Sequence, residues 1–198
     1  MLHRLQIVCL IISVLFTSLA THAQGAPGIT KPSNNGGIYV VAHRGAHQGI
    51  PGNSLPAYQK AIELGCDFIE IDLRTTQDGH FVSIHNATVD AYGEGFTGTV
   101  KEMTLAEIRA LDIGIRIGPE WEGTRVPTFE EILELCTGKI GIYLDMKDAD
   151  IADALKKVQQ YDMEASVLFL NGARNLEKLV ALSNQAIPMP DPGKKFWA

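Results

Sequence analysis

Residues 67–73 read DFIEIDL, a stretch that alternates apolar and acidic residues with the two-residue period of a β-strand. Ile69, Ile71 and Leu73 would point to one face of this strand, and Glu70 and Asp72 to the other. The two carboxylates could occupy the solvent-facing side of an edge strand. They could equally face the inside of a barrel, whose strands have an inner and an outer face.

The rest of the chain alternates predicted strands with predicted helices. Further runs rich in Val, Ile, Phe and Tyr predict strands at residues 38–43, 81–85, 140–146 and 166–170, and a sixth near 186–192. Helical patterns with end signals predict helices at residues 53–65, 104–111, 128–135, 149–161 and 173–184. This alternation favours an α/β class with a parallel sheet or a barrel.

One connection breaks this order. Between Asp72 and Phe81 there is no room for a crossover helix, and Asp78-Gly79 is the turn signal of a β-hairpin. About nine extended residues reach roughly 30 Å, so the chain could instead run back along the strand and begin a parallel neighbour. The sequence leaves both topologies open.

Ionisable side chains stand at the ends of four predicted strands. They are His43 and Arg44 on the first, Glu70 and Asp72 on the second, His85 on the third, and Asp145 and Lys147 on the fourth. If the strands are parallel, these groups gather at the end of the sheet where parallel α/β folds place their active sites. Two structural alternatives need no active site. His43 could be a core histidine with its hydrogen bonds made inside the protein, and Asp145 and Lys147 could form an ordinary ion pair.

Carboxylates on one face of a sheet cannot all stay ionised at close range without a compensating cation. The three candidates, Glu70, Asp72 and Asp145, are hard oxygen ligands that suit Ca²⁺ or Mg²⁺ better than zinc. With a divalent ion, Arg44 and Lys147 added, the site carries a net positive charge that suits a singly charged anion such as a phosphodiester. Two histidines could then serve as general acid and general base.

Four motifs in order resemble the glycerophosphodiester phosphodiesterase family. They are AHRG (42–45), PGNSLPAYQKAIELGCDFIEIDLRTTQDGHFVSIHN (51–86), RVPTFEEILEL (125–135) and IGIYLDMK (140–147). The resemblance implies a (β/α)₈ TIM-like barrel of the phospholipase C-like phosphodiesterase type. It also implies metal-dependent hydrolysis of glycerophosphodiesters to sn-glycerol 3-phosphate and an alcohol.

The resemblance further implies roles for single residues. His43 and His85 match the catalytic acid and base of the family. Arg44 and Lys147 match the residues that bind the substrate phosphate. The metal ligands would be Glu70, Asp72 and Asp145, holding Ca²⁺ or Mg²⁺.

Three positions depart from the usual pattern of the family. Gly52 stands where a glutamate is usual, and Asn86 stands where an aspartate is usual, so two acidic groups near the site are missing. Asp145 replaces the usual glutamate, which keeps the charge but shortens the reach by one methylene.

The chain is short for a complete barrel. Barrels of this type take about 250 residues, so we expect the domain assigned to residues 38–198 to stop after about six strands. Two other functions stay open on this ground and on the departures above. One is a related phospholipase that acts on lysophospholipid or sphingolipid, and the other is an inactive, truncated homologue that binds metal.

The N-terminal residues differ in composition from the rest. Residues 1–23 combine Arg4, an apolar run and small residues, which predicts a secretory signal peptide and a secreted or periplasmic protein; an uncleaved anchor is the alternative. Residues 24–37, rich in Gly, Pro, Ser and Asn, predict a flexible leader. The apolar run is shorter than the roughly 20 residues of a spanning helix, so no stable membrane anchor is expected after cleavage.

The net charge limits the classes of binding partner, and the cysteine content limits the possible disulfide bonds. The formal net charge of −6 at pH 7 argues against nucleic acid as a partner. The family resemblance implies a small-molecule glycerophosphodiester as the substrate. Nothing in the sequence predicts the oligomeric state. Cys66 and Cys136 would remain after loss of the signal segment and could pair in an oxidising compartment, although two cysteines are no disulfide framework.

Overall fold

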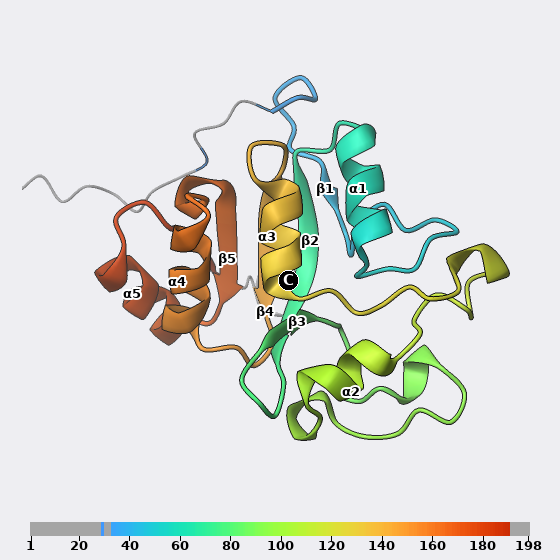
Figure 1. Ribbon diagram of the computed structural model, residues 1–198. Coiled ribbons are helices and arrows are strands. Elements are labelled where there is room, and N and C mark those ends of the chain that lie inside the picture. The colour runs from blue at the N-terminus through green and yellow to red at the C-terminus, as the bar shows by residue number, and fades with distance from the viewer. Residues whose placement is uncertain (1–28, 30–32, 191–198) are drawn as a thin grey trace, which may run out of the picture.

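A six-stranded sheet forms the centre of the fold (Figure 1). Its strands are β1 (Val41–Ala42), β2 (Phe68–Thr75), β3 (Phe81–Ser83), β4 (Gly141–Met146), β5 (Val167–Asn171) and β6 (Ile187–Pro190). Five of them run parallel in the order β1-β2-β4-β5-β6, while β3 pairs antiparallel with β2. All the predicted strands are present, although the first is confined to two residues.

The computed structural model describes residue 29 and residues 33–190. The predicted signal peptide, residues 1–23, and most of the predicted leader, residues 24–37, lie outside the described residues. Within the described part of the chain, no helix has the length and apolar character needed to cross a membrane.

The five predicted helices are confirmed. They are α1 (Leu55–Glu63), α2 (Leu105–Ala110), α3 (Phe129–Cys136), α4 (Ile151–Gln160) and α5 (Ala173–Leu182). Short 3₁₀ turns lie in the connections as η1 (Asp90–Tyr92), η2 (Val100–Glu102), η3 (Pro119–Trp121) and η4 (Glu164–Ser166). Each α-helix begins where the sequence offers a side chain or a turn that can satisfy the free N–H groups of its first turn.

Side-chain caps fix the starts of α1, α2, α3 and α4. The cap of α4 is Asp150, whose Oδ1 accepts from Ala152 N and Asp153 N. Thr104 and Thr128 each accept a backbone N–H from the glutamate three residues on, and that glutamate accepts the threonine's own N–H. At α1 the cap is Ser54, whose Oγ accepts from Ala57 N at 3.3 Å. Asn53, the residue before this cap, makes a different contact, with Asp72.

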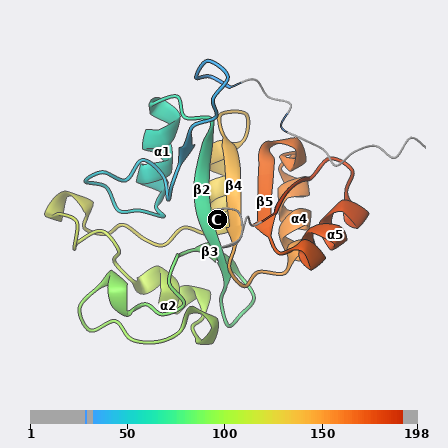
Figure 2. The ribbon, with the colours of Figure 1, turned by 180° about the vertical axis from the view of Figure 1, so that it is seen from behind.

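The helices α1, α3, α4 and α5 pack against one face of the sheet, which stands in front of them in the rear view (Figure 2). The outward-facing side chains of β2, namely Ile69, Ile71 and Leu73, are fully buried in this layer. They share the main core with Phe129 of α3 and Leu155 of α4, among others. The apolar face predicted for residues 67–73 is therefore confirmed.

β2 and β3 form the hairpin that the Asp78-Gly79 signal predicted. Leu73 pairs with Ser83 and Thr75 with Phe81, and Thr76 N donates to His80 O at 2.9 Å across the turn. Gly79 has a φ of +83°, which only glycine adopts without strain. The alternative, in which the chain returns along the strand and then begins a parallel neighbour, is wrong. The turn at Asp78-Gly79 leads directly into the antiparallel strand β3.

Residues 86–127 pack through a second, smaller apolar cluster beside β3. Val82 and Ile84 from the hairpin meet Val100, Ile108 and Val126 there, all essentially inaccessible to solvent. α2 and the 3₁₀ turns η1 and η2 belong to this region, which Figure 1 shows below the main sheet. The long connection between β3 and α3 is thus held by a core of its own.

The parallel strands with helices on one side are part of a (β/α)₈ barrel. This agrees with the predicted fold class, and the described residues contain the six strands expected from the sequence. One detail differs: the strand at residues 81–83 is an antiparallel hairpin arm, so five strands belong to the parallel series.

The two cysteines of the described region are free thiols. Cys136 is buried on α3, and burial raises its pKa to about 12. Burial also raises the pKa of Cys66. The pairing considered from the sequence is therefore not formed in this structure.

Leu144→Ala should destabilise the protein by about 2–5 kcal/mol, because Leu144 is 0% exposed in the central strand β4 and its loss leaves a cavity. Leu182→Ala is the matched control: Leu182 is 50% exposed at the end of α5 and should change stability by about 0.5 kcal/mol or less. Urea unfolding followed by circular dichroism measures both. Equal losses would contradict the packing described for β4.

Candidate active site

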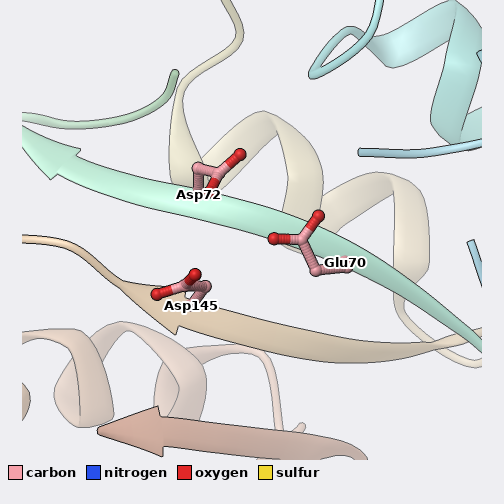
Figure 3. Close-up of side chains that lie close together, drawn as sticks. All are labelled: Glu70, Asp72 and Asp145. Atoms are coloured by element: carbon pink, nitrogen blue, oxygen red, sulfur yellow. The ribbon is translucent and has the colours of Figure 1, made fainter. Parts of the chain in front are cut away.

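Three carboxylates meet on the face of the sheet opposite the main core. Glu70 and Asp72 come from β2, and Asp145 comes from the neighbouring strand β4, where it pairs in register with Asp72. One oxygen atom of each residue lies within 4.8 Å of the others, and Figure 3 shows the three side chains facing a common space. The alternation of DFIEIDL and the parallel β2–β4 register together produce this cluster.

The cluster is costly in electrostatic terms because two of its members are buried. Glu70 is 6% exposed and Asp72 1% exposed. Burial raises the pKa of Glu70 to about 7, and the negative charge of Asp72 adds to the rise. Three ionised carboxylates at this distance therefore need positive charge beside them.

Lys147 and Arg44 provide part of that charge. Lys147 Nζ lies 2.6 Å from Asp145 Oδ2 and 3.0 Å from Asp72 Oδ1. Burial alone would lower the pKa of Lys147, but the hydrogen bond to Asp145 and the negative charges of Asp145 and Asp72 outweigh it and raise the pKa. Arg44 Nε lies 3.6 Å from Asp72 Oδ2, which is a charge contact beyond hydrogen-bond distance.

The residues of the cluster fit a divalent cation. All three are hard oxygen donors on two adjacent strands, the donor type that Ca²⁺ and Mg²⁺ prefer. Asp72 Oδ1 is buried and, despite the proximity of Lys147, accepts no hydrogen bond of good geometry. A divalent ion would give this oxygen a partner. It would also offset the negative charge of the three carboxylates that Lys147 and Arg44 do not balance.

His43 and Arg44 enter the site through a tight turn after β1. Arg44 has a φ of 55° and its N–H donates to Glu70 Oε2 at 2.7 Å. His43 Nε2 lies 4.0 Å from the same Glu70 oxygen, with its side chain 67% exposed. Partial burial lowers the pKa of His43, and the positive charge of Arg44 lowers it further.

Gly45 is the residue that allows this turn. Its φ is +81°, and a Cβ at this position would lie 2.7 Å from the backbone carbon of Ala57 in α1. The turn therefore packs directly on the helix that follows it. The His-Arg-Gly motif thus combines two functional side chains with a glycine that the backbone geometry requires.

Asn53 belongs to the site, a role that the sequence patterns did not assign to it. Its Nδ2 donates to Asp72 Oδ2 at 2.7 Å, and its Oδ1 accepts from Tyr58 at 3.0 Å and from Ser83 at 3.2 Å. All four residues are buried. The signal for this role was the Pro-Gly-Asn motif, which lies next to Ser54, the actual cap.

His85 reaches the site by the return arm of the hairpin. Ile84 N donates to Asp72 O at 2.9 Å, so His85 comes back to the level of Asp72. The prediction that parallel strand ends gather these groups is wrong for His85, because β3 is antiparallel. The hairpin brings it to the same place by turning round beyond the carboxylates.

Arg74 holds the backbone of His85 and was missed from the sequence. Its Nε and Nη2 donate to His85 O at 3.1 Å and 2.9 Å, and its Nη1 donates to Asp148 Oδ2 at 2.8 Å. The signal was present, since Arg74 follows Glu70 and Asp72 at the two-residue spacing of one strand face.

Comparison with known proteins identifies the family. The sequence pattern described as "Glycerophosphoryl diester phosphodiesterase family" matches residues 43–183, which is well over half of the chain. The chain belongs to this family. The match contains every residue of the cluster described above.

Curated relatives agree with this assignment. The chain is 39% identical over 138 residues to a glycerophosphodiester phosphodiesterase of Caldanaerobacter subterraneus, covering 65% of this chain and 56% of that protein. It is 32% identical over 149 residues to glycerophosphodiester phosphodiesterase 1 of Bos taurus, covering 73% of this chain and 44% of that protein. The chain thus spans about half the length of these relatives.

Solved structures confirm the fold. A glycerophosphodiester phosphodiesterase from Agrobacterium tumefaciens aligns with a TM-score of 0.70 at 30% identity, over 77% of this chain and 66% of that one. A phosphodiesterase from Oleispira antarctica, solved in complex with the product sn-glycerol-3-phosphate, aligns with a TM-score of 0.70 at 26% identity, over 77% and 65% of the two chains.

Gly45→Ala should destabilise the protein by about 1–3 kcal/mol, because the added methyl group meets the backbone of Ala57 and the φ is unfavourable. Gly49→Ala is the control, with a φ of +73° and no atom within 4 Å of the added Cβ. Comparing the two thermal transitions separates the steric cost from the cost of the positive φ. A loss in Gly45→Ala no larger than that in Gly49→Ala would mean that the contact with α1 does not matter.

Proposed function

We propose that this protein hydrolyses glycerophosphodiesters to sn-glycerol 3-phosphate and an alcohol. The observation that supports this most is the convergence of three carboxylates with Lys147 and Arg44 in one partly buried cluster. Membership of the glycerophosphoryl diester phosphodiesterase family supports the reaction type.

Glu70, Asp72 and Asp145 hold a divalent cation, Ca²⁺ or Mg²⁺, in this proposal. The ion supplies Lewis-acid stabilisation of the negative charge on the phosphodiester. Arg44 and Lys147 bind the same phosphate, since both cations already lie beside the cluster. Counting formal charges, the three carboxylates, the ion and these two side chains leave one positive charge, which matches a singly charged diester.

His43 and His85 transfer protons on either side of the phosphate. The lowered pKa of His43 favours its neutral imidazole at pH 7, the form that can accept a proton. His85 Nδ1 lies 2.8 Å from Asn86 Oδ1. Because an amide oxygen only accepts, Nδ1 donates in this contact, and Nε2 is the nitrogen left to exchange a proton with the substrate.

Through the same contact, Asn86 takes over the orienting role of the aspartate that is usual beside this histidine in the family. Asn86 orients the imidazole through a hydrogen bond, as a carboxylate would, but adds no negative charge that would stabilise the protonated ring. Arg74 fixes the backbone of His85 from the other side.

A related phospholipase is the second candidate function. Ile115 and Ile117, which precede η3, are 46% and 49% exposed, and exposed aliphatic side chains near a site favour contact with lipid. Comparing turnover of glycerophosphocholine with turnover of micellar lysophosphatidylcholine distinguishes the two, since both carry the same head group.

Mg²⁺ or Ca²⁺ at about 100 times its dissociation constant should stabilise the protein by about 2.7 kcal/mol, because the folded state alone binds the ion. In Asp72→Asn this ion-dependent increment should be largely lost, because the most buried ligand loses its charge. Asp153→Asn, which removes an exposed carboxylate of α4, should keep the full increment. An equal increment in all three proteins, measured by thermal unfolding, would exclude the proposed metal site.

His43→Ala and His85→Ala should each lower kcat for glycerophosphoglycerol by at least about 100-fold, since each removes a proton-transfer group. Neither change should alter the thermal transition by more than a few degrees. His80→Ala, an exposed histidine at the hairpin turn, is the control and should keep wild-type turnover. Wild-type kcat in both site variants would rule out the acid–base assignment.

A further inference from the structure

A hollow of about 310 Å³ lies between the turn after β1 and the loop region of residues 91–117. Its main lining side chains are Arg44, His47, Asn53, Tyr92, Ile113 and Arg116. The volume is at the lower end of the range for pockets that bind small molecules, which begins at about 300 Å³. The sequence patterns gave no reason to connect these two parts of the chain.

The hollow is continuous with the candidate active site through three of its residues. Arg44 lies 3.6 Å from Asp72, and Asn53 donates to the same carboxylate at 2.7 Å. Tyr92 OH accepts from Asn86 N at 3.1 Å, directly after His85. A phosphodiester bound at Arg44 therefore has this hollow beside it, with room for one of its two substituents.

The hollow is lined by positively charged side chains, and one of them has no acidic partner among the described residues. Arg44 has Asp72 as its partner, whereas within the described part of the chain Arg116 donates only to the backbone carbonyl of Ala91. Among the described residues, no carboxylate lies within ion-pair distance of Arg116, and no aspartate or glutamate lines the hollow. An anion entering this space would complete a charge pair.

We propose that this hollow receives the alcohol part of the substrate and that Arg116 selects alcohols carrying negative charge, such as a second phosphate. The inference rests on the proposed function and adds a substrate class to it. Tyr92 by itself could attract a choline group through its ring, but one aromatic ring beside an unpaired guanidinium does not favour a cation. Diesters with a quaternary ammonium are therefore the poorer substrates.

The test compares two diesters, 1,3-bis(glycerophospho)glycerol and glycerophosphocholine, at low salt. Wild-type protein should show a kcat/KM about fivefold higher for the first, which is the upper end for an exposed charge pair. Arg116→Gln should bring the ratio close to one, and Arg116→Glu should reverse it. Raising NaCl should shrink the wild-type ratio, because salt screens an exposed pair.

Arg125→Gln is the matched control. Arg125 is also an exposed arginine that donates to a backbone carbonyl, that of Ala110, but it does not line the hollow. It should leave the ratio unchanged. An unchanged ratio in both Arg116 variants, or an equal change in Arg125→Gln, would overturn the inference.

Binding separates this inference from the proposed reaction. Calorimetric titration of the two diesters into Ca²⁺-loaded His85→Ala protein, with and without Arg116→Gln, reports the preference without requiring turnover. A preference in binding that depends on Arg116, in a wild-type protein that hydrolyses neither diester, would support the hollow and refute the proposed function. Equal binding of both diesters, with or without Arg116, would refute the role of the hollow.

Discussion

The mutual repulsion of three carboxylates is the constraint on which the rest of the site depends. Glu70 and Asp72 are buried on one strand, and Asp145 stands level with Asp72 on the next. At this separation the ionised forms are tolerated only because Lys147 and Arg44 lie against them and because Asn53 donates to Asp72. The helices on the far face leave this side of the sheet free to carry the charge.

The in-register pairing also explains why an aspartate at position 145 is long enough to reach the other two carboxylates. A glutamate would reach one methylene further, but Asp145 faces Asp72 directly across adjacent strands, so a carboxylate oxygen of each comes within 4.8 Å. Gly52 brings no acidic group to the site, and the residue beside it contributes a neutral one. The next residue, Asn53, turns into the site with a φ of 54° and supplies a hydrogen-bond donor to Asp72.

Two cores hold the two halves of the site. The main core under β2 and β4 fixes the carboxylates, while the smaller cluster of Val82, Ile84 and Val100 fixes the connection that follows β3. His85 and Tyr92 belong to this second half. The hollow beside Arg44 lies where the halves meet, so its shape depends on how residues 86–127 pack rather than on the sheet alone.

The sequence by itself determined the helix limits, the strands and most of the site residues, because caps, alternation and the His-Arg-Gly turn are local features. Strand period alone places Glu70 with Asp72 on one face and Asp145 with Lys147 on one face, and the parallel pairing of β2 with β4 brings the two pairs together. The sequence did not decide the direction of β3, the contact of Arg74 with His85 or the network of Asn53. These depend on which segments pack side by side, and that choice is made by burial of apolar surface between distant residues, which no short motif contains.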